Sequence, residues 1–341
     1  MERGCLQRLG EYVPPKAHRI FVVTTEDVWS RHGERVARAL AGRSFHPLFF
    51  PGGEARKRMA EVEALAEQMV ALGGERSSVV VGFGGGIVTD LGGFLAAIFM
   101  RGIPVIQVPT TLLAQVDAAV GGKTGTNLVS GKNLIGAFHQ PLAVLIDPTV
   151  LRTLPEREFR AGLQEILKCG IIRSRALFDL MATRPEAILA QEPAVLDEII
   201  AESVRIKAEV VSADEKEGGL RRILNYGHTV GHALEAETAY ELLLHGEAVA
   251  IGMKIANHLS RLLGTLTVED CALANRTIDQ YGPFPSVASI TPEALLARLG
   301  SDKKAIAGNV HFVLARGIGD TKIVSGVEVD LVREAIVAAL A

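Results

Sequence analysis

Three of the chain's nine histidines, His228, His232 and His245, lie within one short stretch of sequence. His228 and His232 are four residues apart, a spacing that places both imidazoles on the same face of a helix. His245 follows an apolar run and is succeeded by Gly246 and Glu247. Converging imidazoles and a carboxylate can hold zinc with a coordination position left open. A single histidine is more often a hydrogen-bonded core residue, but the cluster predicts a metal site.

The elements that must position these side chains fall into two halves. We expect strands at 19–24, 44–50, 78–81, 105–108 and 144–147, with helices at 26–42, 55–72 and 87–100 between them. This alternation predicts an α/β domain with a doubly wound parallel sheet of Rossmann type. After residue 150 the pattern becomes mainly helical, with predicted helices at 156–168, 176–181, 194–213, 227–239, 247–263 and 292–299 and short strands at 310–314 and 322–325. Because 341 residues exceed the size at which one core keeps growing, we predict two domains, 1–150 and 151–341.

A glycine-rich segment, GFGGG at 82–86, connects a predicted strand to the next helix. In this position glycines let backbone N–H groups and a helix N-terminus approach a pyrophosphate. The spacing is not that of the Rossmann fingerprint, and no acidic residue ends the next strand. A tightly packed turn therefore explains the segment almost as well. Asp90, one turn into the helix, is placed to orient a loop or accept from a ligand.

The composition excludes several classes of protein. A net charge of −3 and 5% aromatic residues leave no electrostatic or stacking surface for nucleic acid. Three widely separated cysteines, Cys5, Cys169 and Cys271, are typical of a reducing compartment and exclude an all-cysteine zinc site. The apolar run near 94–100 is far shorter than the roughly 20 residues of a spanning helix, and the N-terminal residues lack a signal-peptide core. We expect a cytoplasmic protein that binds neither membrane nor nucleic acid.

Longer motifs follow one another in order along the chain. They are DLGGF at 90–94, MRG at 100–102, QVPTTLLAQVDAAVGGKTG at 107–125, GKNLIGAFHQP at 131–141, EFRAGLQEILKCG at 158–170, LNYGHTVGHALE at 224–235 and LLHGEAVAIGM at 243–253. Over essentially its whole length the chain resembles the 3-dehydroquinate synthases of the sugar phosphate cyclase family. The resemblance implies an NAD-binding domain at 1–150, a mainly helical domain at 151–341 that binds metal and substrate, and a divalent metal at the interface between them.

The resemblance also revises the ligand set of the metal. It assigns the metal to Glu165, His228 and His245, and makes His232 a residue that contacts the substrate or lies behind the ligands. Zinc is the expected metal, with cobalt as the alternative. One carboxylate and two imidazoles leave coordination positions for two substrate hydroxyls, as a catalytic zinc requires.

The implied substrate, 3-deoxy-D-arabino-heptulosonate 7-phosphate, carries a carboxylate and a phosphate, so its site needs cations. The resemblance assigns catalytic roles to Lys123, Lys168, Asn225, His232, Glu217 and Asp117, and substrate binding to Arg101, Lys207, Arg221 and one of Lys303 and Lys304. In the family the residue matching Arg101 reaches the phosphate from a neighbouring subunit, which implies a homodimer. A solvated helix face explains Lys303 or Lys304 singly just as well, but not Lys123 in GGKTG or Lys168 in its apolar helix.

The implied NAD site consists of Glu54, Lys57, Gly85, Gly86, Asp90, Thr110, Thr111, Asp117, Lys132 and Asn133. Glu54 and Lys57 match a motif near the nicotinamide ribose. The sequence departs from the family at Thr89, where glycine is common, and at Ala118 and Ala119, where serines are common. Thr25 and Asp27 stand where an aspartate and an asparagine are expected around the adenosine ribose. These departures bear on cofactor affinity rather than on the reaction.

The implied reaction yields 3-dehydroquinate and phosphate through transient oxidation by NAD, phosphate elimination, reduction, ring opening and an intramolecular aldol step. This is a carbon–oxygen lyase of the shikimate pathway, which leads to aromatic amino acids. One alternative is another sugar phosphate cyclase, such as a 2-epi-5-epi-valiolone synthase-like enzyme, whose substrate lacks the carboxylate. Another is an NAD-dependent polyol dehydrogenase of the iron-dependent alcohol dehydrogenase group. Lys207, Arg221, Asn225, His232 and the 302–304 segment match the first interpretation.

Overall fold

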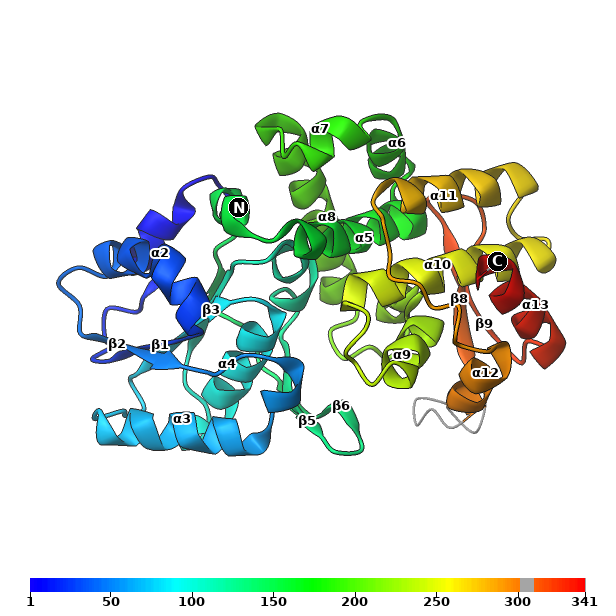
Figure 1. Ribbon diagram of the computed structural model, residues 1–341. Helices are drawn as coiled ribbons and strands as arrows, with labels where there is room; N and C mark the ends of the chain where they lie inside the picture. Colours follow the sequence, from blue (N-terminus) through cyan, green and yellow to red (C-terminus); the bar gives the residue numbers. More distant parts are fainter. Residues whose placement is uncertain (301–309, 341) are drawn as a thin grey trace. The chain divides into compact units, whose positions relative to one another are not determined.

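The computed structural model describes residues 1–300 and 310–340 and divides into two compact units, Met1–Phe159 and Arg160–Ala341 (Figure 1). Unit 1 contains a five-stranded parallel sheet. Its strands are β1 (Ile20–Thr24), β2 (Phe45–Phe49), β3 (Val79–Gly84), β4 (Val105–Pro109) and β7 (Ala143–Val144), in the order β2-β1-β3-β4-β7. The predicted doubly wound parallel sheet is thus confirmed. The strand order reverses between β1 and β3, and the carboxyl ends of strands at such a switch point are where ligands bind in this class of sheet.

Alternate side chains of β1 enter two different cores. Val22 packs in one with Val36 of α2, and Val23 packs in the other with Leu65 of α3 and Leu91 of α4. The helices concerned are α2 (Glu26–Ala39), α3 (Met59–Ala71) and α4 (Gly86–Ile98). Figure 1 shows α2 on one face of the sheet and α3 and α4 on the other. Burial on both faces explains why these strands are continuous apolar runs in the sequence.

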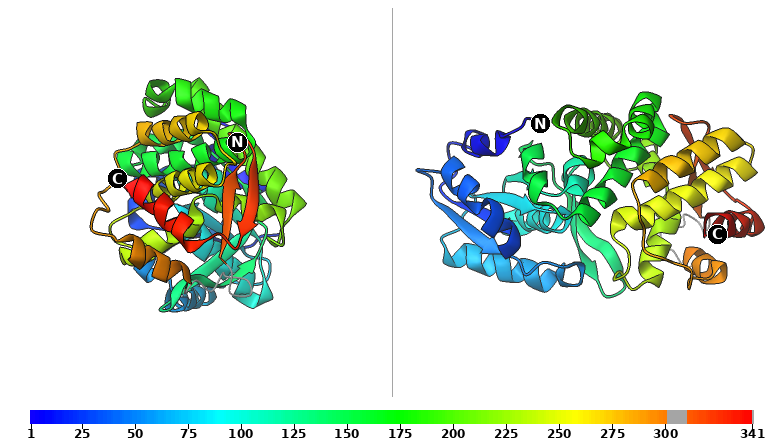
Figure 2. Two further views of the ribbon diagram at one scale, coloured as in Figure 1. Left: turned by 90° about the vertical axis from the view of Figure 1, so that its right-hand side faces the viewer. Right: turned by 45° about the horizontal axis from the view of Figure 1, so that its top comes forward.

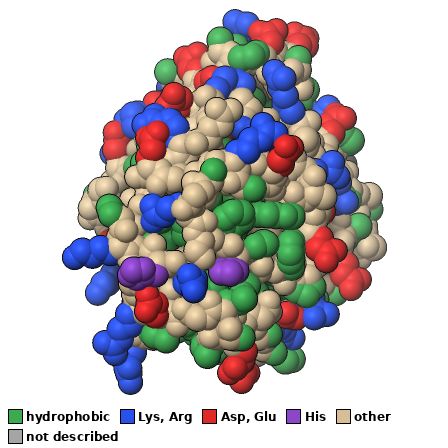
Figure 3. Space-filling view, turned by 90° about the vertical axis from the view of Figure 1, so that its left-hand side faces the viewer, with side chains coloured by type: hydrophobic (Ala, Val, Ile, Leu, Met, Phe, Trp, Pro, Cys, Tyr) green, Lys and Arg blue, Asp and Glu red, His purple; other side chains and the backbone are tan. Residues whose placement is uncertain are grey.

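The edge of this sheet is formed by β2, which pairs only with β1 among the described strands. Trp29 of α2 packs against Phe45 and Phe49 of this strand, with ring centroids 6.5 and 6.2 Å apart. The β2 edge belongs to the side of the molecule that Figure 3 shows, where hydrophobic side chains gather in the middle and charged ones surround them. The aromatic cluster packs this edge strand against α2.

Two features of unit 1 differ from the sequence prediction. The strand expected at 144–147 is only Ala143–Val144, because Asp147 instead caps a 3-10 helix, Pro148–Thr153. An antiparallel hairpin of β5 (Lys123–Leu128) and β6 (Gly131–Phe138) was not predicted. Its strands are rich in glycine and polar residues and β6 is partly exposed along its length, so no strong alternation marks it. The remaining short elements of the unit are 3-10 helices at Cys5–Arg8, Glu54–Arg56 and Phe99–Arg101, α1 (Leu9–Tyr12) and a π-helix at Ala114–Ala118.

Unit 2 is mainly helical, as predicted. Its helices are α5 (Glu156–Arg173), in which the boundary between the units falls, α6 (Arg175–Thr183), α7 (Pro185–Leu189), α8 (Pro193–Ala213), α9 (His228–Glu237), α10 (His245–Leu262), α11 (Val268–Gln280), α12 (Pro292–Gly300) and α13 (Val329–Leu340). A 3-10 helix covers Leu220–Asn225, and β8 (His311–Ala315) pairs with β9 (Thr321–Ser325) in an antiparallel pair. Helices α7, α11 and α13 were not predicted. Among the described helices, none is both long and apolar enough to cross a membrane.

The pair α9 and α10 packs through glycine. A Cβ at Gly252 would lie 1.9 Å from the carbonyl oxygen of Gly227, and one at Gly231 would lie 3.1 Å from that of Ala248. Gly227 itself has φ of 77°, a left-handed conformation that glycine adopts without strain. Figures 1 and 2 show the resulting close pairing of the two helices. Glycine at these positions lets the backbone of α10 approach the start of α9 closely.

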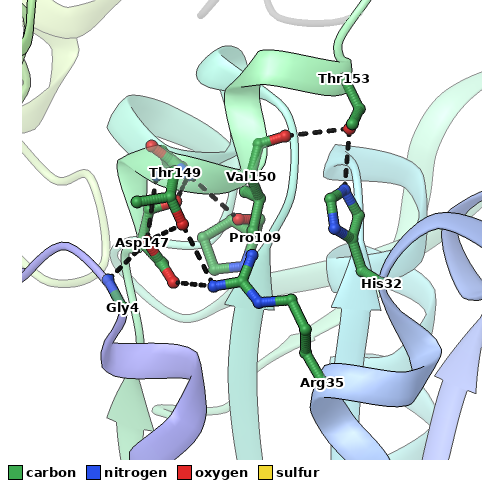
Figure 4. A network of polar contacts seen from close by, with 9 residues as sticks. Gly4, His32, Arg35, Pro109, Asp147, Thr149, Val150 and Thr153 are labelled. Carbon is green, nitrogen blue, oxygen red and sulfur yellow. Dashed lines mark hydrogen bonds and ion pairs between the residues drawn. The ribbon is translucent and has the colours of Figure 1, made fainter.

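A buried carboxylate holds the N-terminal segment of unit 1 to the end of the sheet (Figure 4). Asp147, 1% exposed, accepts hydrogen bonds from the backbone N–H groups of Gly4 and Thr149 at 2.9 and 3.0 Å and from the Thr149 hydroxyl at 2.7 Å. Arg35 of α2 forms an ion pair with it at 2.8 Å. Burial alone would raise the pKa of Asp147, but the hydrogen bonds from Thr149 and Gly4 and the Arg35 charge together lower it.

Replacing Asp147 by Asn should destabilise unit 1 by about 1–3 kcal/mol, because the amide would present N–H groups to donors. A carboxylate with a lowered pKa stabilises the fold above its unfolded pKa of about 4, and this contribution is lost as the pH falls. The difference in melting temperature between wild type and Asp147→Asn should therefore be largest near pH 7 and shrink towards pH 3. Glu34→Gln, at an exposed site on α2, is the control and should behave like wild type. Equal melting temperatures for the Asp147 variant and wild type at pH 7 would show that these contacts do not stabilise the unit.

Candidate active site

Three potential metal ligands from three helices of unit 2 converge. Glu165 lies on α5, and His228 and His245 are the first residues of α9 and α10. The Nε2 atoms of both histidines lie 3.6 Å from the same carboxylate oxygen, Glu165 Oε1. One donor atom from each of the three residues lies within 4.8 Å of the other two. This spacing suits a single ion held by one carboxylate and two imidazoles.

The second ring nitrogen of each histidine faces an acceptor. Nδ1 of His228 is 3.0 Å from the backbone carbonyl of Tyr226, and Nδ1 of His245 is 3.5 Å from Glu235 Oε2. With Nδ1 as the hydrogen-bond donor, each ring turns its Nε2 lone pair towards Glu165. Acceptors of this kind fix the tautomer and orientation of metal-binding histidines.

The charge state of the cluster also suits a cation. Glu165 is 1% exposed, and neither of its oxygens accepts a hydrogen bond from the described residues, although Oε2 forms a close ion pair with Lys168 Nζ. Burial, and then the charge of Lys168, hold the pKa of His228 well below its usual value, so this imidazole is neutral. A buried carboxylate whose oxygens accept no hydrogen bond from the described residues, beside a neutral imidazole, suits a divalent metal such as zinc.

His232 lies one turn beyond His228 on α9 and belongs to a different group. Its ring centroid is 5.4 Å from that of His228 and 6.0 Å from that of His245. Its donor atom lies within 4.8 Å of those of Glu235 and His245. Among the described residues, no group of potential ligands contains all three histidines. The arrangement thus favours Glu165 over His232 as the partner of His228 and His245.

Unit 2 also buries cations. Among the lysines and arginines of the described residues, those that are buried are Lys57, Lys168, Lys207 and Arg221. All of them belong to the site predicted from the sequence, and the last three lie in unit 2. Buried cations are rare in proteins unless they are paired or bind anions.

The segment before Arg221 is organised by one carboxylate. Asp214 accepts hydrogen bonds from the backbone N–H groups of Gly218, Gly219 and Arg221 at 2.8, 2.7 and 3.0 Å, and these bonds lower its pKa. Glu217, within this loop, has φ of 61° and accepts a hydrogen bond from Asn225 Nδ2 at 2.7 Å. The predicted catalytic pair Glu217 and Asn225 is therefore in direct contact.

In unit 1 the glycine-rich turn follows β3 and leads into α4. Gly85 is the N-terminal cap of α4, and no side chain caps this end of the helix within the described part of the chain. A Cβ at Gly85 would lie 3.0 Å from the methyl group of Thr111, and one at Gly86 would lie 3.1 Å from that of Ala118. The turn therefore presents bare backbone N–H groups at a helix N-terminus, which is the geometry that binds a pyrophosphate.

A second group of predicted cofactor residues forms a polar network. Nζ of Lys57, 2% exposed, lies 2.5 Å from Asp90 Oδ2 and 2.6 Å from Asn133 Oδ1. Burial raises the pKa of Asp90, and the charge of Lys57 opposes this shift. Asp90 of α4 and Asn133 of β6 thus meet at the amine of Lys57, which lies on the turn after β2.

The other predicted residues are placed as follows. Asp117 lies on the π-helix, Thr110 and Thr111 follow β4, Lys123 begins β5 and is exposed, and Lys132 lies on β6. Of the departures from the family, Thr25 donates to Asp27 at 2.5 Å at the start of α2, and Thr89 donates to the Gly86 carbonyl at 3.0 Å. Arg101 is exposed, whereas Lys303 and Lys304 lie outside the described residues.

Solved structures with the same fold define the class of protein. The 2-epi-5-epi-valiolone synthase of Streptomyces hygroscopicus subsp. jinggangensis 5008, solved with NAD+ and Zn2+ bound, is 32% identical with a TM-score of 0.89, covering 97% of this chain and 94% of that one. A 2-deoxy-scyllo-inosose synthase complexed with carbaglucose-6-phosphate, NAD+ and Co2+ is 27% identical with a TM-score of 0.87, covering 98% and 94%. A probable glycerol dehydrogenase from Sinorhizobium meliloti 1021, 17% identical with a TM-score of 0.71 over 99% and 94%, shares the fold alone. The fold is that of the sugar phosphate cyclases.

The family itself follows from sequence comparison. The model of the 3-dehydroquinate synthase N-terminal domain matches residues 47–161, and that of the C-terminal domain matches 162–305. A 3-dehydroquinate synthase of Solibacter usitatus (strain Ellin6076) is 61% identical over 100% of this chain and 96% of its own length. Another, of Koribacter versatilis (strain Ellin345), is 49% identical over 96% and 89%. This chain belongs to the 3-dehydroquinate synthase family.

Several residues that support the site were not predicted from the sequence. Glu235 could have been found, because it lies three residues after His232 and so on the same helix face. Tyr226 acts through its backbone carbonyl, for which no residue type is a signal. The loop that contains Asp214 has no periodic sequence pattern from which its role could have been predicted.

Replacing His228 or His245 by Ala should empty the proposed metal site, because each supplies an Nε2 donor directed at Glu165. His232→Ala should retain near-stoichiometric metal and lose activity. Glu235→Gln should weaken metal binding roughly 10–100-fold, since it loosens the orientation of His245. Metal content by mass spectrometry and affinity by competition with a chelator measure these effects. Loss of metal from the His232 variant equal to that from the His228 variant would favour a ligand set that includes His232.

Proposed function

We propose that this chain converts 3-deoxy-D-arabino-heptulosonate 7-phosphate to 3-dehydroquinate and phosphate, as a lyase of the shikimate pathway. The observation that carries the proposal is the buried cluster of Glu165, His228 and His245 with Lys168 against it, in a chain of the 3-dehydroquinate synthase family. NAD and one divalent metal are its cofactors, with zinc the expected ion and cobalt the alternative. Three buried cysteines, each present as a thiol rather than in a disulfide, support a reducing, cytoplasmic location.

The two units divide the work between them in this proposal. Unit 1 binds NAD through the glycine turn at Gly85 and Gly86 and through the network around Lys57. Unit 2 binds the metal and the substrate. When bound, NAD would accept and return a hydride, and the metal would acidify the hydroxyl that is oxidised.

The side chains of the chain itself do the remaining work. Lys168, Lys207 and Arg221 provide positive charge for the two anionic groups of the substrate, and their burial strengthens those interactions. Glu217 and Asn225, already hydrogen-bonded to each other, offer an acceptor and a donor for substrate hydroxyls. His232 stands beside the ligand histidines without belonging to their ligand group, as expected for a residue that contacts the substrate.

The proposed reaction is tested by incubating the metal-loaded protein and NAD with each candidate sugar phosphate. With 3-deoxy-D-arabino-heptulosonate 7-phosphate we expect phosphate release without net NADH. Sedoheptulose 7-phosphate and glucose 6-phosphate, the substrates of other cyclases, should release little phosphate. Net formation of NADH from a polyol would instead indicate a dehydrogenase.

We further propose a homodimer in which Arg101 acts in the site of the neighbouring subunit. Arg101 is exposed and has a backbone φ of 71°, and its neighbour Met100 has a φ of 48°. Residues other than glycine rarely adopt these backbone conformations. Large apolar side chains around this turn are exposed, namely Ile98, Met100, Phe138 and Leu142, at 40–56%. The end of β6 is tied to the same region by a 2.9 Å contact between His139 Nε2 and the Ile103 carbonyl. An apolar face beside a strained arginine supports coverage by a second copy.

Mixing an inactive Arg101→Ala protein with an inactive Lys168→Ala protein should restore part of the activity, because a mixed dimer has one site with both residues intact. Dimer formation is followed by sedimentation, and activity by phosphate release. Verified mixed dimers without any recovered activity would refute the shared site.

Lys168→Met should lower kcat/KM by at least ~100-fold, because a charge-assisted contact worth about 3 kcal/mol at the transition state is lost. The metal-loaded variant should melt close to wild type, since the ion compensates the charge of Glu165. The metal-free variant should melt lower, because Glu165 is then buried without its ion-pair partner. Melting curves with and without metal, together with kinetics, measure these effects. A variant with nearly full activity would show that Lys168 has only a structural role.

A further inference from the structure

The β5–β6 hairpin contains an irregularity at Asn127. Thr126 pairs with Ile135 and Leu128 with Gly131, so one residue of β5, Asn127, lies opposite three residues of β6, 132–134, and has no partner across this ladder of described residues. Its backbone N–H donates instead to the Lys57 carbonyl at 2.8 Å. Bulges of this kind redirect a side chain and are common next to active sites.

The carboxamide of Asn127 makes well-defined contacts. Its Nδ2 donates to the backbone carbonyl of Glu54 at 3.1 Å and to Glu54 Oε1 at 2.7 Å. Its Oδ1 accepts from the backbone N–H of Asn133 at 2.8 Å. The residue is 6% exposed. Because the amide nitrogen faces two acceptors and the amide oxygen faces a donor, the side chain has one favourable orientation.

The partners of Asn127 share a location in the proposed NAD site. Glu54 and Lys57 lie on the turn after β2, and Asn133 lies on β6, where it accepts from Lys57 Nζ. Asn133 has φ of 53°, a conformation that must be held by its surroundings. Asn127 is hydrogen-bonded to all three of these residues. Its side chain contacts Glu54 and Asn133, and its backbone N–H contacts Lys57.

We propose that Asn127 is a positioning residue that holds Glu54, Lys57 and Asn133 in the arrangement that receives the nicotinamide side of NAD. The inference rests on the proposed cofactor site of unit 1. Asn127 acts through the other three residues rather than on the reacting atoms. Its loss should therefore appear in NAD affinity before it appears in chemistry at saturating NAD.

The test compares NAD binding by calorimetry for wild type and Asn127→Asp, a change of almost equal volume. The carboxylate would face the carbonyl and carboxylate of Glu54, so the two residues would repel each other. We expect the Kd for NAD to rise at least ~10-fold, with metal content unchanged and kcat at saturating NAD reduced far less. Adding Glu54→Gln supplies a donor to the new carboxylate, and the double variant should bind NAD more tightly than the sum of the single effects predicts.

Two further variants make the outcome decisive. Thr126→Val is the matched control, because Thr126 is fully buried in the same strand and its hydroxyl has no hydrogen-bond partner within the described part of the chain. It should bind NAD like wild type.

Asn127→Ser, which shortens the side chain without adding charge, replaces the Asp variant if that protein does not fold, and should also weaken NAD binding. Wild-type affinity in both Asn127 variants would overturn the inference, whereas failure of wild type to bind NAD would overturn the proposed cofactor site itself.

Discussion

The cost of burying the charge of Glu165 governs the architecture of unit 2. A carboxylate that is 1% exposed and accepts no hydrogen bond from residues 1–300 and 310–340 is unstable unless positive charge lies beside it. Lys168 supplies that charge from the next turn of α5, and the spacing of three residues places both side chains on one face of the helix. The two imidazoles approach from other helices, each with its Nε2 atom 3.6 Å from Glu165 Oε1. The carboxylate therefore makes the cluster attractive to a cation, and the lysine keeps it stable without one.

Convergence of these groups depends on how closely α9 and α10 approach. Gly252 against the Gly227 carbonyl, and Gly231 against Ala248, allow backbone contact where a methyl group would collide. Helix α10 is buried along much of its length in a core shared with α13 and β8. The positions of His228 and His245 are thus set by backbone packing, and the acceptors at Tyr226 and Glu235 adjust only the ring orientations.

Much of this organisation could be predicted from sequence, for identifiable reasons. Strands buried on both faces are continuous apolar runs, so the parallel sheet was predicted. The spacing of His228 and His232 revealed the cluster but not Glu165, because Glu165 lies far away in the sequence and only family motifs connected it to the histidines. The β5–β6 hairpin escaped prediction because its strands are half-exposed and rich in glycine. Asn127 was missed with it, since a bulge depends on cross-strand register. The α13 sequence does carry apolar residues at helical spacing, so that omission had no physical cause.

His228 and His245 are the first residues of their helices. The aligned peptide dipoles of α9 and α10 therefore bring their positive ends to the cluster of Glu165, His228 and His245. Such a potential opposes the binding of a cation and favours any negative charge that develops near it. The negative charge of Glu165 offsets the unfavourable effect on cation binding. The stabilisation of negative charge can still act on a substrate. A hydroxyl bound beside these helix termini would lose its proton more readily than a hydroxyl in the same cluster without them. The helix termini therefore lower the energy of the alkoxide that forms.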